Sequence, residues 1–397
     1  MRKSAEKIDV IVIGAGASGL MCAIEAGNRG RRVLLLDHED KVGQKITISG
    51  GGYCNFTNRQ VSADNYISHN CHFPKSALNR YTQWDIIRLL ETHKVAYQEK
   101  EQGHFFCEKS AQELCDVLLQ ECKQSRVEKQ LGTTVLGVEL LDAGVFVVKT
   151  DRGDLKCASL VIATGGLSFP SLGASTLGYK IAEQFNIKVW PPRAGLVPLR
   201  YSQSERERYS VLSGVAVDAV VRCGNQRFCD SLLFTHRGLS GPAILQLSSY
   251  WQEGYSITIN LLPEQDLLAL LKKKQQDEPQ RTLKSVLFDV LPKRVVSVFV
   301  DEGLLVKSLS ACSAVCFRDI ACTLQQWTML PHSTEGYRVA EVTVGGVDCD
   351  AISSKTMEVK KIKGLYFIGE VLDLTGQLGG YNLQWAWSSG WCAGQYV

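Results

Sequence analysis

The sequence predicts an α/β fold in which a doubly wound parallel sheet is split by a long insertion. Three short apolar runs predict the sheet, because each breaks into glycines at its carboxyl end. These runs are Ile8–Ile13, Leu160–Gly166 and Gly364–Asp373. Residues 167–363 separate the second run from the third, and a proline-marked change of composition begins at Trp190. Both observations predict that an inserted domain interrupts the parallel sheet.

The first run carries a nucleotide-binding motif. Ile8–Ile13 leads into Gly14-Ala15-Gly16-Ala17-Ser18-Gly19, a G-x-G-x-x-G sequence, and a helical pattern follows. These glycines permit a tight turn, close approach of a pyrophosphate, and packing of the helix on the strand. A second strand, Arg32–Leu36, ends at Asp37, 18 residues after Gly19. This is near the spacing of about 20 at which an acid binds ribose hydroxyls, so the pattern predicts a dinucleotide site.

The other two glycine-ended runs indicate that one large ligand is held from several sides. In an open parallel sheet, ligands bind outside the carboxyl ends of the strands. Leu160–Gly166 ends in "ATGG", and Gly364–Asp373 is followed by "TGQLGGYNLQWAWSSG", a glycine turn leading into a helical segment. A nucleotide domain whose last strand returns after an insertion is typical of the glutathione-reductase-like FAD fold. There the final helix points its N-terminus at the flavin, so we expect FAD.

The insertion is expected to have a β part and a helical part. Short alternating runs at Val215–Arg222, Gln226–Cys229 and Ser256–Leu261 predict antiparallel strands. The predicted domains are an FAD-binding domain at 1–190 and 338–397, an inserted antiparallel β-barrel domain at 191–262 and 319–337, and a helical subdomain at 263–318.

Composition narrows the function classes. The net charge is +3, whereas a nucleic-acid-binding domain usually concentrates basic residues. The 14 cysteines contain no C-x-x-C pair and are interpreted as small buried hydrophobes in a reducing cytosol. The N-terminal apolar run enters a glycine turn instead of a cleavage site, and no apolar run reaches about 18 residues. We therefore expect a cytoplasmic protein with a small-molecule substrate and no nucleic-acid, membrane or metal partner.

Four stretches resemble one family. "SGGGYCNFTN", "FTHRGLSGPAIL", "AEVTVGGV" and "GLYFIGEVLDLTGQLGGYNLQWAWSSG" are similar to the bacterial HI0933-like (YhiN/BaiN-type) flavoproteins, over essentially the whole chain. The resemblance implies an NAD(P)/FAD-dependent oxidoreductase with non-covalent FAD, a split Rossmann-like domain and an inserted β-barrel with a helical subdomain. Relatives include an aminoacetone oxidase, and for most members the substrate is not settled. Many members carry a cation where this chain has Gln44 and Tyr53.

The expected cofactor site combines the motif residues with positions that the resemblance implies. In "SGGGYCNFTN", the glycines let backbone lie against a ligand, and the short polar side chains of Asn55 and Thr57 suit its polar edges. Cys54 has no nearby resolving cysteine and no adjacent histidine or lysine, so we expect it to be packed instead of reactive. The full set of predicted cofactor residues is Gly14, Gly16, Ala17, Ser18, Gly19, Asp37, His38, Lys45, Gly50, Gly51, Asn55, Thr57, Val135, Ala163, Thr164, Gly165, Gly369, Glu370, Asp373, Gly380, Asn382 and Leu383.

The expected reaction is hydride transfer between flavin N5 and a small organic substrate or NAD(P)H. No second G-x-G-x-x-G is present, so the sequence predicts no dedicated nicotinamide-binding domain. NAD(P)H is therefore a candidate reductant that would bind only transiently. The candidates for proton transfer are His236, Tyr381 and Glu341. His236 precedes a predicted helix start in which Ser240 is the N-cap.

Three alternatives remain open for the function. They are a flavin-dependent amine oxidase, a flavin-dependent RNA-modifying enzyme and a non-enzymatic flavoprotein sensor. The near-neutral charge and the lack of a basic arm weigh against the RNA enzyme. A long insertion that forms a roof over the flavin weighs against the sensor.

Overall fold

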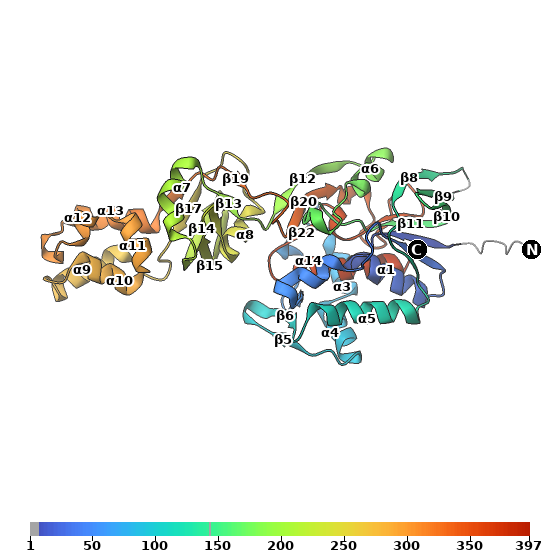
Figure 1. Cartoon of the computed structure of the whole chain (residues 1–397), viewed down its shortest axis with the longest axis horizontal. Coiled ribbons are helices and arrows are strands. Elements are labelled where there is room, and N and C mark those ends of the chain that lie inside the picture. Colours follow the sequence, from blue (N-terminus) through green and yellow to red (C-terminus); the bar gives the residue numbers. More distant parts are fainter. Residues whose placement is uncertain (1–7, 143) are drawn as a thin grey trace, which may run out of the picture. The chain divides into compact units, whose positions relative to one another are not determined.

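A computed structural model describes residues 8–142 and 144–397 of the chain. The chain divides into two compact units, Met1–Arg193 with Val342–Val397 and Ala194–Glu341, whose elements are labelled in Figure 1. The first unit is assembled from two separate parts of the sequence, as the return of a late glycine-ended strand requires. The functional labels given to the predicted domains stay predictions.

The centre of the first unit is a five-stranded parallel sheet in the order β21-β11-β1-β2-β7. The four strands other than β7 are buried along their whole length, which explains why their residues are apolar except for Ser159 at the start of β11. The predicted α/β class is confirmed, and the three glycine-ended runs lie side by side as β1, β11 and β21. The strands are β1 (Val10–Ile13), β2 (Val33–Leu36), β7 (Glu128–Gln130), β11 (Ser159–Ile162) and β21 (Leu365–Phe367).

Two helices pack closely beside this sheet, namely α1 (Ala17–Asn28) and α14 (Tyr381–Gly394). A Cβ atom at Gly390 would lie 2.4 Å from the Ser18 carbonyl oxygen, and one at Gly394 would lie 2.4 Å from the Cβ of Glu25. Residues four apart share one helix face. The helix backbones therefore approach each other along a glycine-lined face of α14.

Smaller elements complete the first unit. Two antiparallel sheets have three strands each, in the orders β3-β6-β5 and β10-β9-β8, and two sheets have two strands each, β22-β4 and β12-β20. The strands are β3 (Asn55–Asn58), β4 (Tyr66–Ile67), β5 (Tyr97–Glu99), β6 (His104–Cys107), β8 (Val135–Leu140), β9 (Phe146–Thr150), β10 (Gly153–Cys157), β12 (Val189–Gly195), β20 (Val342–Val347) and β22 (Thr375–Gly376). The helices are α2 (Gln44–Ile48), α3 (Pro74–Arg80), α4 (Gln83–Thr92), α5 (Ala111–Gln124) and α6 (Leu177–Gln184).

The second unit has its own core and an antiparallel seven-stranded sheet in the order β18-β17-β14-β15-β16-β13-β19. β18 and β19 lie at opposite ends of this order, so the predicted closure into a barrel is not confirmed. The strands are β13 (Leu199–Arg200), β14 (Ala216–Cys223), β15 (Gln226–Phe234), β16 (Gly238–Ser240), β17 (Ile257–Asn260), β18 (Trp327–Met329) and β19 (Ser333–Thr334). The helices are α7 (Gln203–Tyr209), α8 (Pro242–Ser248), α9 (Leu267–Asp277), α10 (Leu283–Val290), α11 (Lys293–Phe299), α12 (Glu302–Leu305) and α13 (Ala314–Gln325).

The predicted start of α8 is wrong by one residue. Ser240 ends β16, and Gly241 occupies the N-cap of α8 without a side-chain cap. Gly241 has φ of 87°, and a Cβ atom there would lie 2.6 Å from the Ser231 carbonyl oxygen. The tight turn from strand to helix therefore needs glycine at the N-cap, which local capping preference does not indicate.

The close packing of α1 and α14 generates a stability prediction. We expect Gly390→Ala to lower the free energy of unfolding by about 1–3 kcal/mol, the usual cost of overpacking, because the new methyl group meets backbone. Gly137→Ala is the matched control, since a Cβ atom at that strand position meets nothing within 4 Å. Denaturant unfolding measures both variants. Equal stability of Gly390→Ala and the parent protein would contradict the packing argument.

Candidate functional site

The turn between β1 and α1 forms one side of the candidate site. Gly14 has φ of 110°, and a Cβ atom there would lie 2.3 Å from the Ala163 carbonyl oxygen, so only glycine fits. The backbone N–H of Ala15 donates to Asp37 Oδ2 at 2.6 Å, and the N–H of Glu39 donates to Asp37 Oδ1 at 2.9 Å. The motif turn and the acid at the end of β2 are therefore held against each other, as the sequence predicts for a ribose-binding pair.

The N-terminus of α1 is suited to an anion. The first turn of an α-helix leaves backbone N–H groups without partners in the helix, and no side chain caps α1 at Gly16. A Cβ atom at Gly16 would meet nothing within 4 Å, so open space lies beside this residue. Free N–H groups, a positive dipole end and open space together suit a phosphate group.

The end of β11 contributes a second wall. Thr164 Oγ1 is buried and has no hydrogen-bond partner within the described residues. Gly165 follows with φ of 71°, and a Cβ atom there would lie 3.5 Å from Lys45 Nζ. An orphaned buried hydroxyl is costly unless a ligand or water satisfies it. This hydroxyl therefore marks a place where a polar ligand group fits.

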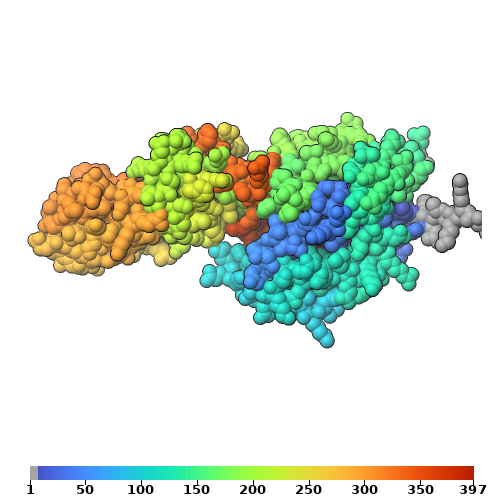
Figure 2. Space-filling view, viewed as in Figure 1, coloured from blue at the N-terminus to red at the C-terminus, as the bar shows by residue number. Residues whose placement is uncertain are grey.

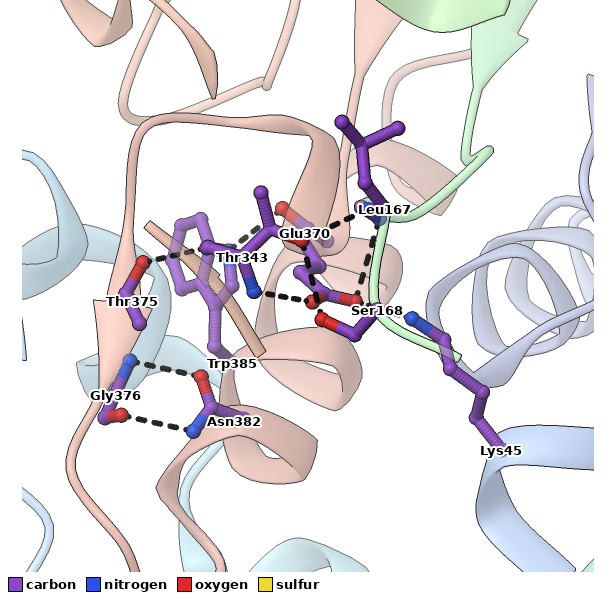
Figure 3. Close-up of polar contacts among 11 residues, drawn as sticks. Lys45, Leu167, Ser168, Thr343, Glu370, Thr375, Gly376, Asn382 and Trp385 are labelled. Atoms are coloured by element: carbon purple, nitrogen blue, oxygen red, sulfur yellow. Dashed lines mark hydrogen bonds and ion pairs between the residues drawn. The ribbon is translucent and has the colours of Figure 1, made fainter. Parts of the chain in front are cut away.

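The Glu370 carboxylate connects three distant segments of the first unit, as Figure 3 shows. Lys45 Nζ lies 2.5 Å from Glu370 Oε2, and the Gly166 N–H donates to the same oxygen at 3.3 Å. The Thr343 N–H donates to Oε1 at 2.9 Å, and the Thr343 hydroxyl accepts from the Leu167 N–H at 2.7 Å. Lys45 and Glu370, predicted separately, thus form an ion pair. Their neighbour Thr343 is fully buried and was not predicted, because it lies inside an apolar strand.

The segment after β21 is anchored by hydrogen bonds that sequence reasoning missed. Asp373 Oδ2 accepts from the His69 N–H at 2.9 Å and lies 2.8 Å from His69 Nδ1. The His69 ring stacks on Trp190, with 3.4 Å between centroids and 2° between planes. His69 belongs to no motif, so only the fold shows that it holds Asp373, a predicted cofactor-binding residue.

The N-terminus of α14 closes the candidate site. The Asn382 amide bonds both backbone groups of Gly376, at 2.8 and 2.9 Å, and shapes the glycine turn before the helix. Gly380 is the N-cap and has no side-chain cap. In the orientation that satisfies its amide, Asn55 accepts from the Gly380 N–H at 3.2 Å. Thr57 donates to Gln384 at 2.6 Å inside the core, so this side chain holds α14 instead of facing open space.

The other predicted cofactor residues lie in or beside the elements already described. His38 Nδ1 is 3.6 Å from Asp37 Oδ1. The Thr133 N–H donates to the Asp37 carbonyl at 2.8 Å, and this places the strand that begins at Val135 beside Asp37. A Cβ atom at Gly369 would lie 2.4 Å from Ser18 Oγ. The remaining positions lie within the elements already described: Ala17 and Gly19 in α1, Ala163 after β11, Gly50 and Gly51 in the loop before β3, and Leu383 in α14.

The three candidates for proton transfer do not share a unit. Tyr381 is a buried residue at the start of α14, and burial raises the pKa of its phenol. His236 is exposed in the turn between β15 and β16, and Glu341 is the exposed last residue of the second unit. Their roles therefore stay predictions.

Cys54 lies in a strained and buried position. It has φ of 52°, a left-handed conformation that is uncommon outside glycine, and its side chain is fully buried. Burial raises the pKa of its thiol well above the ordinary value. The thiol is therefore protonated at neutral pH and a poor nucleophile.

Two kinds of feature are absent from the described ranges, residues 8–142 and 144–397. No helix there is long and apolar enough to span a membrane. No group of three or more histidine, cysteine or acidic side chains there could hold a metal ion.

Comparisons with known proteins extend over nearly the whole chain. The HI0933-like protein Rossmann domain matches residues 8–396. The chain is 50% identical over 392 residues to the "Ribosomal RNA dihydrouridine synthase" of Escherichia coli (strain K12), with 98% of each chain covered. It is 26% identical over 404 residues to the "3-dehydro-bile acid delta(4,6)-reductase" of Clostridium scindens, with 97% of each covered. The solved 3-ketosteroid-delta4-(5alpha)-dehydrogenase of Rhodococcus jostii RHA1 has a TM-score of 0.50 at 14% identity, covering 99% of this chain and 98% of that one, which is a likeness of fold.

These comparisons overturn one expectation. Composition predicted a small-molecule substrate and no nucleic acid, but a relative that is half identical along its length is named for action on ribosomal RNA. The physical reason is that a net charge of +3 averages over the whole surface. An enzyme needs cations only where its substrate's phosphates lie. Bulk charge therefore does not exclude an RNA substrate.

The environment of Cys54 generates a prediction about thiol reactivity. We expect iodoacetamide to alkylate the exposed Cys71 in the native protein and to leave Cys54 unmodified, because Cys54 is buried and protonated. Peptide mass spectrometry after brief labelling measures both sites, and labelling in denaturant is the control. Alkylation of both cysteines at the same rate would contradict this assignment.

We also expect Cys54→Ser to keep bound cofactor and measurable turnover.

Proposed function

The chain belongs to the HI0933-like family, and we propose that it is an FAD-dependent reductase that converts uridine in ribosomal RNA to dihydrouridine. One observation carries the proposal: 50% identity to the ribosomal RNA dihydrouridine synthase of Escherichia coli over 98% of both chains. A match of this extent includes every segment of the candidate site, from the α1 turn to α14.

The residues of the first unit fit FAD. The uncapped N-terminus of α1 and the open space at Gly16 suit the pyrophosphate, and Asp37 suits the ribose. The orphaned Thr164 hydroxyl offers a hydrogen bond. The uncapped N-terminus of α14 at Gly380 provides a positive dipole end for the flavin ring. Reduced FAD, when bound there, supplies the hydride that uridine reduction needs.

The chemistry of the product defines what the protein must supply besides the flavin hydride. Dihydrouridine carries one more hydrogen than uridine on each of C5 and C6. Since the C4 carbonyl is conjugated with the C5–C6 double bond, hydride adds at C6 and a proton at C5. The chain must therefore hold the base and deliver a proton. Tyr381 is our candidate donor within the first unit, because it is the first residue of α14, whose N-terminus is proposed to face the flavin, and its phenol is protonated at neutral pH. Burial raises the pKa of this phenol further. His236 and Glu341 stay candidates from the second unit.

A second candidate function is reduction of a small conjugated ketone. The Clostridium scindens relative is named for reducing a 3-dehydro-bile acid, whose double bonds are conjugated with a carbonyl as in uridine. The shared chemistry supports reduction of such double bonds as the reaction class. The identity of 26%, against 50% for the ribosomal RNA enzyme, favours RNA as the substrate.

The cofactor proposal is tested by two glycine substitutions. We expect Gly16→Val to fold with a loss of less than about 1 kcal/mol, because the backbone there is extended and the space is open. It should lose bound FAD, because the side chain fills the phosphate position. Gly14→Ala is the contrast: it should lose about 2 kcal/mol or more of stability, since its methyl group meets the Ala163 backbone. Flavin absorbance and thermal melting measure both. A yellow Gly16→Val protein at full occupancy would contradict the assignment.

The reaction is tested on ribosomal RNA from cells that lack the enzyme. We expect the purified protein, with FAD and NADPH or NADH under anaerobic conditions, to form dihydrouridine, because the chain is 50% identical to a ribosomal RNA dihydrouridine synthase. Mass spectrometry of the digested nucleosides detects the gain of two hydrogens, and Gly16→Val serves as the inactive control. If a conjugated bile-acid ketone is reduced and the RNA is not, the second candidate function replaces the first.

A further inference from the structure

We propose that the face of the β3-β6-β5 sheet that carries Tyr53, Phe106 and Lys100 stacks and holds an unpaired nucleotide of the RNA substrate. This inference rests on the proposed function and adds a substrate-binding surface to it. We call this surface the Tyr53 face. The part of the first unit around β5 and β6, cyan in Figure 2, lies at the molecular surface.

The alternation of β6 separates two faces of this small sheet. Successive side chains of a strand point to opposite faces, so His104 and Phe106 share one face and Phe105 and Cys107 share the other. Burial follows the same alternation, because Phe105 and Cys107 are buried and the other two are half-buried. Phe106 and its neighbours therefore form the more accessible face.

An exposed aromatic ring and a cation meet on this face. The Tyr53 side chain is 46% exposed, and its carbonyl accepts from the Cys107 N–H at 2.9 Å, which fixes its backbone against β6. Lys100 Nζ lies 5.7 Å from the centroid of the Tyr53 ring and 4.4 Å from that of Phe106. Among the described residues Lys100 has no carboxylate within ion-pair distance, so its charge is available to a phosphate.

The same face adjoins the proposed cofactor cradle. A Cβ atom at Gly50 would lie 2.8 Å from the Phe106 ring, and one at Gly379 would lie 2.4 Å from His104 Nε2. Asn55 pairs with Phe106 across the strands and contacts the Gly380 N–H at the start of α14. The Tyr53 face is thus continuous with the segments proposed to contact the flavin.

The proposed reaction explains why such a surface is needed. An enzyme that acts on a base must take it out of the stack, which leaves neighbouring bases without a stacking partner. Unstacked bases of RNA bind aromatic rings, while nearby cations bind the backbone. Tyr53 supplies an exposed ring and Lys100 an unpaired cation, beside the place where the base must meet the cofactor.

The opposite face of the same sheet offers a matched control. Trp84 is 45% exposed, and the Arg59 guanidinium lies 5.8 Å from its ring centroid, but Arg59 forms an ion pair with Glu99. Arg59 also lies over Phe105, on the face away from Phe106. Trp84→Ala therefore removes an equally exposed aromatic residue whose cation is already neutralised.

The test measures RNA binding directly, by fluorescence anisotropy with a single-stranded ribosomal RNA fragment. We expect Tyr53→Ala to weaken binding about 5- to 150-fold, the range that stacking of one base gives, and Tyr53→Phe to stay within about twofold. Lys100→Ala should reduce the slope of log affinity against log salt by about 1. Trp84→Ala, and Lys129→Ala on the edge strand β7, should bind like the parent protein. Melting temperatures confirm that each variant folds.

The outcomes separate this inference from the proposed function. Wild-type affinity of Tyr53→Ala, or absence of RNA binding by the parent protein, overturns the Tyr53 face. Weakened binding by Tyr53→Ala, in a protein that forms no dihydrouridine, supports the face and overturns the function. Weakened binding that raises KM for dihydrouridine formation and leaves the rate of flavin reduction by NAD(P)H unchanged supports both.

Discussion

The first unit depends on backbone contacts that only glycine permits around the N-terminus of α1. A Cβ atom at Gly19 would lie 1.9 Å from the Gly14 carbonyl oxygen, and one at Gly14 would lie 2.3 Å from that of Ala163. A Cβ atom at Gly390 of α14 would lie 2.4 Å from the Ser18 carbonyl oxygen. These contacts bring β1, β11, α1 and α14 together at one place. The same close packing places the uncapped N-terminus of α1 beside open space at Gly16, which is the position proposed for the phosphates.

The carboxylate of Glu370 joins the two parts of the sequence that make up the first unit. Glu370 contacts Lys45, the Gly166 N–H and the Thr343 N–H. Thr343 lies in β20, the first strand after the insertion returns. Hydrogen bonds to a charged group are stronger than neutral ones, so this carboxylate secures the returning chain to the N-terminal part of the unit. The segments of the candidate site can therefore be held together although Ala194–Glu341 is inserted between them in the sequence.

The mistaken expectation about nucleic acid shows what composition can and cannot decide. Net charge concerns the average field of the surface, and it governs solubility and non-specific attraction. Recognition of an unstacked base needs a few well-placed aromatic and polar groups instead. On the Tyr53 face one unpaired lysine accompanies an exposed ring. Such a surface leaves the net charge of the chain almost unchanged, so composition cannot reveal it.

Local sequence pattern was enough to find the buried strands of the parallel sheet, the glycine turn beside Asp37, and the position of "ATGG" and "GEVLD" at strand ends. An apolar run and the glycine turn that ends it are both marked by adjacent residues. Local pattern was not enough for Thr343 and His69, which hold Glu370 and Asp373 through contacts across more than 25 residues and 300 residues respectively. It also missed the inward role of Thr57 and the glycine N-cap of α8. Only tertiary structure decides these features, because each follows from how closely two distant backbones approach.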